Sequence, residues 1–484
     1  MKIIFDVSTL SDMVTKTSSR VGICLTTYNL LGEFLHYASC HDEIEILFYV
    51  DMRSDVAVKK YFQSSDVYKK IDNICMYSKL SQWVSWGFCW RFGFTPKNAL
   101  EKFLAKSFTA LLLLGQKIFA PFDKIVLDKE ETYIFFSPRY KIPDIIKNHP
   151  HIIKFTLLHD TIPLELSEYF PQNKKQWFRE LFDSLNSEDY YFANSICTRN
   201  DFLKHAPQIN PSHFWVTYLA ANKSFFPDVN NAKNQRIRQK YHIPPDKKYI
   251  FSLCSLEPRK NLLFVVENFI HFIRENAIDD VVFVLGGGHW EEFIGKLDRK
   301  IASLGDYRYK IIKAGYVDDE DLANLYAHSL CSVYLSIYEG FGLPALEAMA
   351  CGAPLIASST TSLPEVVGDG GLLVSPSDDI ALREAFGKIY FDPEFAKALS
   401  MRGREQAKQF SWEKCAQEMI EKMQAVAGAG QGKKCEEKSE EESGKKECQK
   451  ECEEKRGEKC EQKSGEKNSE NSEKCEHKQE KKCH

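Results

Sequence analysis

The chain of 484 residues lacks three features that define common protein classes. It has no basic excess, because 64 Lys and Arg stand against 68 Asp and Glu, so a nucleic-acid backbone finds no surplus of cations. It has no long apolar run, since the most apolar segment, 107–119, is free of charge for only ten residues and a membrane span needs about 18–20. The N-terminal MKIIFDVSTL carries Asp6 within its apolar run and does not form a secretory h-region. We therefore expect a cytoplasmic protein without nucleic-acid partners.

Paired cysteine spacing is also lacking in the body of the chain. Nine of the fifteen cysteines are scattered singly before residue 428, and without a signal peptide we expect them to be reduced thiols. The other six lie near the C-terminus, where Cys448 and Cys452 are four residues apart and Cys475 precedes His477. We predict a solvated low-complexity extension there, with metal or redox binding as the alternative.

The C-terminal segment 428–484 contains no large aliphatic or aromatic residue. It buries too little apolar surface to offset the entropy of ordering, so we predict a disordered tail. The other ~427 residues are too many for one core and suit two domains of about 200 residues each.

Twelve short apolar runs alternate with helix-length amphipathic segments, which is typical of parallel sheets covered by helices on both faces. The runs fall into two blocks of six, so we predict an α/β protein with two doubly wound domains, 1–225 and 240–405, joined by the polar segment 222–235. Ligands bind such sheets at the carboxyl ends of the strands. The predicted strands are 2–8, 43–50, 133–138, 152–160, 189–195, 213–220, 249–255, 281–287, 309–317, 331–338, 354–359 and 371–376.

The segment SIYEGFGLPALEAMACG, residues 336–352, holds Glu339 and Glu347 and no other charge. Pro344 suits the first position of a helix, so we predict a helix over about 344–351 whose amino end points at a glycine-rich turn. Free N–H groups and partial positive charge there favour an anion. Carboxylates repel phosphate but accept hydrogen bonds from hydroxyls, so phosphate on the turn, with hydroxyl pairs on Glu339 and Glu347, describes a nucleotide-sugar. Helix capping with two surface glutamates is the alternative.

A second segment, CSLEPRKNLLFVVENF at 254–269, follows a predicted strand and opens a helix near Asn261. Arg259 and Lys260 then lie at the amino end of that helix, where cations oppose the helix dipole. A diphosphate between the two side chains and the helix amides removes this conflict. Two solvated basic residues on a loop are the other interpretation.

Five motifs together resemble the retaining GT-B glycosyltransferases of family 4, and most closely their bacterial mannosyltransferase-like branch: EPRKN, LGGG, GYVDDEDLANLYAHS, EGFGLPALEAMACGAPLIAS and TSLPEVVGDGGLLVSPSD. The resemblance covers the second domain almost completely and the first domain more thinly. It implies a GT-B fold, in which two Rossmann-like domains face a cleft and a closing helix, here 406–427, returns to the first domain. It also implies transfer of a hexose from a nucleoside-diphosphate sugar to an acceptor hydroxyl, with retention of configuration.

The resemblance assigns roles by position. Glu339 is expected to contact the donor sugar and Glu347 the ribose hydroxyls, while Arg259 and Lys260 neutralise the diphosphate as it leaves. Alanine in place of Lys260 or Glu339 is predicted to abolish most transfer and to leave the fold intact. Further donor-side positions are Gly22, Tyr316, Val317, Leu322, Phe341, Gly342 and Leu343.

The first domain contributes His159, in LLHDTIP, which corresponds to the family's histidine beside the reacting sugar. A lone His-Asp pair after a strand is otherwise more often structural. The residues expected to act in catalysis are His159, Arg259, Lys260 and Glu339, and the acceptor-side residues are Asp160 and Arg20.

One loop of the first domain departs from the family pattern. Related enzymes have Gly-Ile-Gly-Arg or similar there, whereas this chain reads RVGICLTTYNLL, with Cys24 and Leu25 in place of the second glycine and the arginine. Arg20 is the candidate to supply the missing charge from the other side. The departure leaves the acceptor-side geometry, and activity itself, open.

Neither a metal nor a redox cofactor is expected. Asp319, Glu320 and Asp321 have the form of an Asp-x-Asp metal motif, but they open a predicted helix, where acids are expected as caps and dipole partners. The basic pair and the amino end of the 344–351 helix supply fixed positive charge instead. LGGGHW lacks Gly-x-Gly-x-x-Gly spacing, so no dinucleotide is expected.

The motifs leave the donor open. The family branch favours GDP-mannose, and a UDP-sugar that supplies a glucosyl or N-acetylhexosaminyl group is the alternative. A glycogen-type synthase, a phosphorylase and a non-catalytic sugar-nucleotide-binding protein are the rivals, although no lysine motif for pyridoxal phosphate is recognisable.

The acceptor prediction depends on segment 83–108, WVSWGFCWRFGFTPKNALEKFLAKSF, which interleaves Trp and Phe with Lys and Arg and so suits a membrane interface. Peripheral contact with the inner face of the cytoplasmic membrane suits a glycan or lipid-linked glycan acceptor in the synthesis of lipopolysaccharide, O-antigen or another cell-surface polysaccharide. Packing of these helices on the first domain's own core is the alternative.

Overall fold

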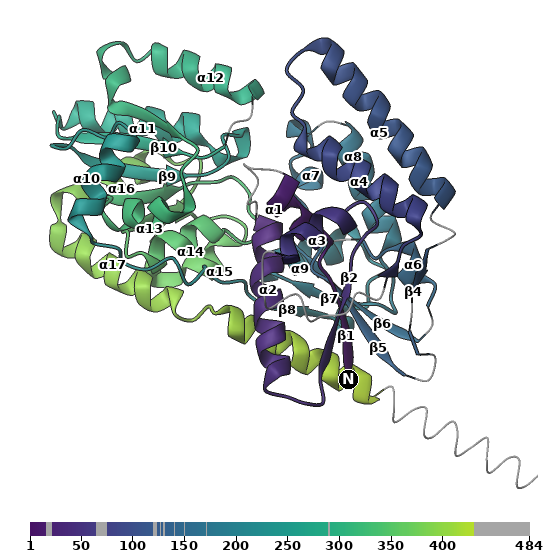
Figure 1. The fold of residues 1–484 in the computed structure, drawn as a ribbon. Coiled ribbons are helices and arrows are strands. Elements are labelled where there is room, and N and C mark those ends of the chain that lie inside the picture. Colours follow the sequence, from purple (N-terminus) through teal and green to yellow (C-terminus); the bar gives the residue numbers. More distant parts are fainter. Residues whose placement is uncertain are drawn as a thin grey trace, which may run out of the picture. The chain divides into compact units, whose positions relative to one another are not determined.

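The computed structural model describes residues 1–15, 22–63, 75–119, 123–125, 127–128, 131–139, 141–149, 151–170, 172–288 and 291–429. Residues 1–423 form one compact unit that contains two six-stranded sheets (Figure 1). We call residues 1–220, which contain the first sheet, the first lobe, and residues 231–407, which contain the second sheet, the second lobe.

The first lobe has a sheet in the order β2-β1-β5-β6-β7-β8, in which all neighbouring strands are parallel. Its central strands β5 and β6 are mostly apolar because both faces of the sheet are covered, and every residue of β5 is buried. The strands are β1 (Lys2–Asp6), β2 (Glu45–Tyr49), β5 (Tyr133–Ser137), β6 (Ile152–Leu158), β7 (Tyr190–Ala193) and β8 (Phe214–Val216).

The second lobe repeats this design in the order β11-β10-β9-β12-β13-β14, again with parallel neighbours throughout. Every residue of β10 and of the central strand β12 is buried. The strands are β9 (Lys248–Leu253), β10 (Val281–Gly286), β11 (Ile311–Gly315), β12 (Cys331–Tyr334), β13 (Leu355–Ser358) and β14 (Leu372–Val374).

All twelve predicted strands are present, which confirms the prediction of two doubly wound parallel sheets. Several strands are shorter than predicted; β8 ends at Val216 rather than at residue 220, and β12 ends at Tyr334 rather than at residue 338. After β12 the chain leaves the sheet, and the Ile337 N–H donates to the Arg259 carbonyl (2.8 Å) rather than to a neighbouring strand. The sequence does not predict a small antiparallel pair, β3 (Cys75–Met76) with β4 (Lys124–Ile125).

Helices connect the strands of both lobes (Figure 1). In the first lobe they are α1 (Asp12–Thr15), α2 (Gly22–Ser39), α3 (Asp55–Gln63), α4 (Lys79–Gly93), α5 (Ala99–Phe119), α6 (Asp144–Lys147), α7 (Ile162–Glu165), α8 (Gln172–Ser184) and α9 (Ile196–His205). In the second lobe they are α10 (Asn231–Lys240), α11 (Leu262–Glu275), α12 (Glu291–Ala302), α13 (Asp319–Ala327), α14 (Leu343–Ala350), α15 (Leu363–Val367), α16 (Asp379–Phe391) and α17 (Pro393–Ala407).

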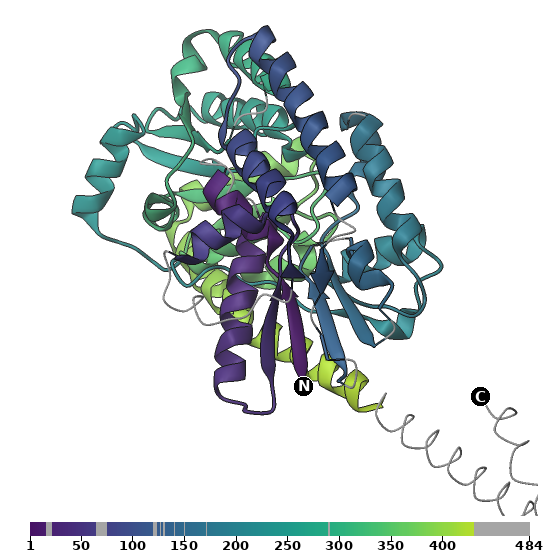
Figure 2. The same cartoon turned by 45° about the vertical axis from the view of Figure 1, so that its right-hand side comes forward.

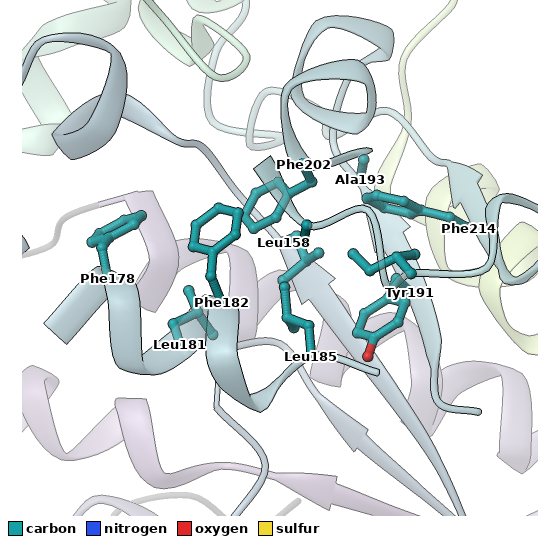
Figure 3. Packing of buried hydrophobic residues seen from close by; sticks show 11 residues of the cluster. Leu158, Phe178, Leu181, Phe182, Leu185, Tyr191, Ala193, Phe202 and Phe214 are labelled. Atoms are coloured by element: carbon teal, nitrogen blue, oxygen red, sulfur yellow. The ribbon is translucent and has the colours of Figure 1, made fainter. Parts of the chain in front are cut away.

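A buried apolar cluster fixes α8 and α9 against the strands β6, β7 and β8 (Figure 3). Phe182 of α8 stacks on Phe202 of α9 with ring centroids 5.0 Å apart, and Phe214 of β8 meets Tyr191 of β7 edge-on at 5.8 Å. Aromatic pairs of this kind add about 0.5–1.5 kcal/mol each to the energy of burial. The cluster therefore holds α9 firmly, and the amino end of α9 enters the site described below.

A last helix, residues 412–429, follows α17. Within the compact unit it returns to the first lobe, because the Thr217 hydroxyl lies 3.3 Å from both the Cys415 carbonyl and a Glu418 carboxylate oxygen. The helix includes residues 428 and 429, which the sequence assigns to the disordered tail. The rest of that predicted tail lies outside the described residues. None of the described helices is long and apolar enough to cross a bilayer.

Candidate active site

The centre of the site is a buried carboxylate held by two cations. Glu339 is only 6% exposed; one of its oxygens lies 2.5 Å from Lys260 Nζ, and the other lies 2.9 Å from Arg259 Nη1. Tyr334, at the end of β12, also donates its hydroxyl to Glu339 (2.8 Å) and accepts from Lys260 Nζ (2.6 Å). The structure therefore brings together three of the four residues that the sequence assigns to catalysis.

This arrangement sets the charge of the Glu339 carboxyl. Burial raises its pKa, but the charges of Lys260 and Arg259 and their hydrogen bonds outweigh burial and bring the pKa down to about 2. The guanidinium of Arg259 also pairs with Glu257 (2.7 Å), and the two carboxylates hold its pKa above the usual value against the opposing effect of burial. Protein carboxylates therefore pair with both cations in this structure. The contact of the two side chains with a diphosphate stays a prediction.

The backbone around the basic pair explains this geometry. Residues Pro258–Lys260 form a single 3-10 turn, and Asn261 adopts a left-handed conformation (φ 59°) from which α11 starts. The Asn261 side chain donates to the Pro376 carbonyl (2.7 Å), and Arg259 Nη1 donates to the Tyr338 carbonyl (3.0 Å). The turn between β9 and α11 is thus fastened to the segment that carries Glu339.

The glycine-rich turn after Glu339 ends in α14, one residue earlier than the predicted start at Pro344. Gly342 caps this helix with φ 102°, a conformation that other residues rarely adopt. The Ser362 hydroxyl lies 3.0 Å from the carbonyls of both Glu339 and Phe341 and fixes the turn from the other side. The amino end of α14 therefore points at the turn, as the sequence predicts.

His159 of the first lobe reaches the same turn. A Cβ on Gly340 would lie 2.2 Å from the His159 carbonyl oxygen, so only glycine permits this close approach. Nε2 of His159 lies 2.7 Å from the Pro138 carbonyl and so carries the proton that it donates. Burial lowers the pKa of this imidazole to about 4, against the opposing effect of that hydrogen bond. His159 is therefore neutral near pH 7 and suited to hydrogen bonding rather than to charge stabilisation.

Glu347, the other glutamate of the pair, has a different environment on α14. Burial raises its pKa to about 8, and the nearby charge of Asp319 adds to the effect. The pKa of Glu347 thus favours the protonated form at neutral pH in this structure. Hydrogen-bond donors placed against Glu347, such as the hydroxyls of a ribose, would instead favour its ionised form.

The acids at the start of α13 have partners of their own, although the charge of Asp319 also acts on Glu347. Asp321 is buried and accepts from Lys240 Nζ (2.5 Å) and from the Tyr241 hydroxyl (2.8 Å). Lys240 also pairs with Asp318 (2.6 Å). Within the described ranges, no group of three or more His, Cys, Asp or Glu side chains is placed to hold a metal ion.

The remaining predicted positions are spread over both lobes. Asp160, next to His159, accepts from the Ile162 N–H (3.1 Å) at the start of α7. Tyr316 is 45% exposed, and Gly22 begins α2. Arg20 lies outside the described residues. The other donor-side residues are buried or partly buried: Val317, Leu322, Phe341, Gly342 and Leu343.

Sequence reasoning missed several residues that complete the site. Tyr334 lies within the predicted strand 331–338, and Glu257 is the first residue of the EPRKN motif, so the sequence holds a signal for both. Ser195 and Thr198 of the first lobe hold the Gly340 carbonyl at 2.6 and 3.1 Å, and nothing in their local sequence indicates this contact.

Comparison with known sequences places the chain in a family. The model of the family described as glycosyl transferases group 1 matches residues 233–406. O-antigen chain mannosyltransferase B of Escherichia coli is 32% identical over 292 residues, which cover 60% of this chain and 74% of that protein. Serotype-specific mannosyltransferase WbdA of Escherichia coli is 29% identical over 270 residues, and the chain spans about a third (32%) of its length.

Comparison with solved structures confirms the GT-B fold. Anabaena HepE, in complex with UDP and glucose, superimposes with a TM-score of 0.58 at 16% identity, over 88% of this chain and 100% of that one. WaaG, a glycosyltransferase involved in lipopolysaccharide biosynthesis, gives a TM-score of 0.56 at 13% identity, over 86% and 98% of the two chains. Together with the match to the mannosyltransferase of Escherichia coli, the fold and the site show that the chain belongs to the group 1 glycosyl transferases.

Proposed function

We propose that the protein transfers mannose from GDP-mannose to a glycan or lipid-linked glycan acceptor, with retention of configuration, in the synthesis of a cell-surface polysaccharide. The observation that carries the proposal is the Glu339 carboxylate, which lies between Arg259 and Lys260 and directly before the turn that contacts His159. Both relatives are named as mannosyltransferases, one of them of the O-antigen chain, and these names favour mannose as the transferred sugar.

The basic pair does the electrostatic work of the reaction. The bond from the anomeric carbon to the diphosphate breaks, the acceptor oxygen bonds to that carbon, and the acceptor proton leaves with the diphosphate. Negative charge grows on the leaving group, and Arg259 and Lys260 are already fixed where they can stabilise it. Before the donor binds, Glu339 balances their charge; once the diphosphate takes that role, the carboxylate accepts hydrogen bonds from the sugar.

Calorimetric titration with nucleotide-sugars tests the donor. We expect GDP-mannose to bind at least about 10-fold more tightly than UDP-glucose or UDP-N-acetylglucosamine, which corresponds to about 1.4 kcal/mol. Tighter binding of a UDP-sugar would instead support the UDP-dependent alternative. The anomeric configuration of the product, determined by NMR, decides retention, and unchanged transfer in EDTA is the expected sign that no metal takes part.

The proposed acceptor side includes a membrane contact through α4 and α5. The two helices pack together (Figures 1 and 2), and a Cβ on Gly87 of α4 would lie 2.6 Å from a methyl of Leu112 on α5. The inner faces of the two helices therefore pack against the first lobe, as the alternative to a membrane contact predicted. Val84, Phe88 and Leu112 join Met52 in a buried cluster there. This packing does not account for the apolar side chains on the outer faces of the two helices.

The outer faces of α4 and α5 are rich in large apolar side chains. Trp83 is 76% exposed, Leu100 is 67% exposed and Leu111 is 62% exposed. An apolar surface of this kind on a soluble lobe marks an interaction site. Trp, Phe and Leu beside Lys residues suit an interface with anionic lipid. The other strongly exposed apolar residues here are Leu80, Trp86, Trp90, Phe103, Leu104, Leu114 and Ile118.

Vesicle flotation tests the membrane contact. We expect the full chain to float with vesicles that contain phosphatidylglycerol, and a variant with Trp83→Ser, Trp86→Ser and Leu100→Ser to remain at the bottom of the gradient. A matched variant that removes the exposed side chains of Tyr309 and Ile380 in the second lobe should still float. Equal behaviour of both variants would contradict the proposed contact.

A further inference from the structure

A glutamate of the second lobe caps a helix of the first lobe. The two carboxylate oxygens of Glu365, in α15, accept from the backbone N–H groups of Ile196 (2.9 Å) and Cys197 (3.1 Å), the first two residues of α9. The Tyr218 hydroxyl donates to the same carboxylate (3.1 Å). The first amides of a helix have no partner within the helix, and a carboxylate there is also favoured by the helix dipole. Glu365 therefore makes a specific contact between the lobes.

The capped end of α9 in turn holds the active-site turn. Ser195 accepts from the Thr198 N–H (2.9 Å), which completes the cap, and its hydroxyl donates to the Gly340 carbonyl (2.6 Å). The Thr198 hydroxyl lies 3.1 Å from the Gly340 carbonyl and 3.2 Å from the His159 carbonyl. The two residues at the amino end of α9 thus join the backbone of His159 to the backbone beside Glu339.

A second contact between the lobes lies on the side of α9. The Tyr338 hydroxyl donates to Asp201 of α9 and lies 3.1 Å from the Thr161 hydroxyl. Burial, together with the nearby Asp201, raises the pKa of Tyr338, so the phenol keeps its proton and remains a donor. On its other face α9 is fixed by Phe202 in the apolar cluster of the first lobe (Figure 3). The position of α9 is therefore determined from three sides.

We propose that Glu365 is a positioning residue for sugar transfer. It touches neither the basic pair nor Glu339 in the described contacts, and it acts through α9, whose Ser195 and Thr198 set the distance between His159 and the Glu339 turn. Loss of the cap leaves the two lobes free to separate at this point. Small displacements of reacting groups reduce rates by up to about 10²-fold, so the effect falls on turnover rather than on donor affinity. The inference rests on the proposed function only for this kinetic consequence.

Hydrogen–deuterium exchange and kinetics on the full chain test the proposal. In Glu365→Ala we expect the amides of Ile196 and Cys197 to exchange at least about 10-fold faster than in the wild type. We expect kcat to fall about 10- to 100-fold while the Kd for the donor changes less than twofold. Glu365→Gln, which keeps one acceptor oxygen, should give intermediate values for both.

Two controls separate this contact from a general loss of structure. Glu384→Ala removes an exposed glutamate of the same lobe, in α16, and should leave both readouts at wild-type values. Tyr218→Phe removes one hydrogen bond to Glu365 and should shift exchange in the same direction by a smaller factor. If Glu365→Ala folds, and the exchange of the two amides or kcat is unchanged, the proposal is wrong.

The design also separates this proposal from the proposed function. If no nucleotide-sugar is bound or turned over by the wild type, the proposed function fails, whereas exchange at the amino end of α9 still reports the contact. If the wild type is active and Glu365→Ala keeps its full rate, the positioning role fails and the proposed function stands.

Discussion

The two ends of the segment 339–347 carry the same side chain in opposite environments. Glu339 lies between Arg259 and Lys260, which outweigh burial and lower its pKa to about 2. Glu347, eight residues later, has no cation among the groups that set its pKa; burial and Asp319 raise the value to about 8. The spacing of two glutamates is thus a property of the sequence, whereas the charge of each is set by elements far along the chain.

The difference indicates two ways of preparing a site for a ligand. Glu339 is ionised and already paired, so its surroundings are ordered before the donor arrives, as electrostatic catalysis requires. The pKa of Glu347 favours the protonated form, and hydrogen-bond donors on a ligand can shift it to the ionised form. We therefore expect substitutions at the two glutamates to have opposite effects on stability, although both lower the rate of transfer.

The largest expected effect comes from Glu339→Ala. Removing it leaves Arg259 and Lys260 with an uncompensated buried charge, and such changes lower the free energy of unfolding by about 3–5 kcal/mol. Transfer should fall by about 10²–10³-fold. The sequence alone predicts an intact fold for this variant. From the buried ion pairs in the structure we instead expect the variant to be less stable than the wild type. Urea unfolding and initial rates measure the two effects.

A paired variant checks this explanation. Arg259 keeps its ion pair with Glu257 when Glu339 is removed, so Lys260 is the cation that loses its carboxylate partner. Glu339→Ala with Lys260→Met removes that cation, so the double variant should be more stable than Glu339→Ala alone and remain inactive. Equal stability of the single and the double variant would show that the unpaired charge of Lys260 does not cause the loss of stability in Glu339→Ala.

The opposite sign is expected for Glu347→Gln. The raised pKa means that the folded state binds a proton that the unfolded state, with a pKa near 4.5, has lost, so wild-type stability falls as the pH rises from about 4.5 to 8. Glutamine mimics the protonated form. The free energy of unfolding of the variant should therefore equal that of the wild type at pH 4.5 but exceed it by ~2–3 kcal/mol at pH 8.5, allowing for partial exposure of the side chain. Thermal unfolding at the two pH values measures the difference.

Donor binding provides the control for Glu347. If the carboxylate accepts from ribose hydroxyls, Glu347→Gln should weaken donor affinity about 10-fold while it stabilises the protein, because hydrogen bonds to a charged acceptor contribute about 1.5–3 kcal/mol. Stabilisation without any loss of affinity would remove Glu347 from the donor site. Glu384→Gln on the surface of α16 should change neither quantity.

A smaller effect is expected from the turn between the two glutamates. Gly340→Ala places a Cβ 2.2 Å from the His159 carbonyl oxygen and 2.8 Å from Asp160 Cβ, so the backbone must move. We expect a loss of about 1–3 kcal/mol of stability, together with reduced transfer. Gly32→Ala within α2, where a Cβ meets nothing within 4 Å, should be neutral or slightly stabilising. Denaturant midpoints of the two variants provide the comparison.

The sequence predicts well what depends on local pattern. All twelve strands follow from their apolar runs, and the start of α14 follows from Pro344 and the glycines before it. The grouping of Arg259, Lys260 and Glu339 follows from the family motif, because each lies just after a strand of one sheet.

Contacts between the lobes could not be predicted in the same way. Glu365 and Ser195 are ordinary helix-start residues in the sequence, and their partners lie 169 and 145 positions away. The ion pairs of Arg259 and Lys260 with Glu257 and Glu339 were not predicted for a related reason: a motif gives the spacing of charges along the chain but not which carboxylate turns inward. The pKa of Glu347 likewise depends on burial and on Asp319 of another helix.

The smallest expected effect is on the pH dependence of the reaction, which distinguishes the ionisation of His159 from that of Glu347. Burial lowers the pKa of His159 to about 4, so its imidazole stays neutral from pH 5.5 to 7.5 and contributes no inflection there. Any rise of donor affinity with pH should instead follow Glu347, near pH 8, and should vanish in Glu347→Gln. In that variant we expect kcat/KM to change less than about twofold between pH 5.5 and 7.5. An inflection near pH 6.5 that persists in Glu347→Gln and disappears in His159→Gln would mean that the histidine ionises during the reaction, because only a solvated imidazole titrates at its ordinary value.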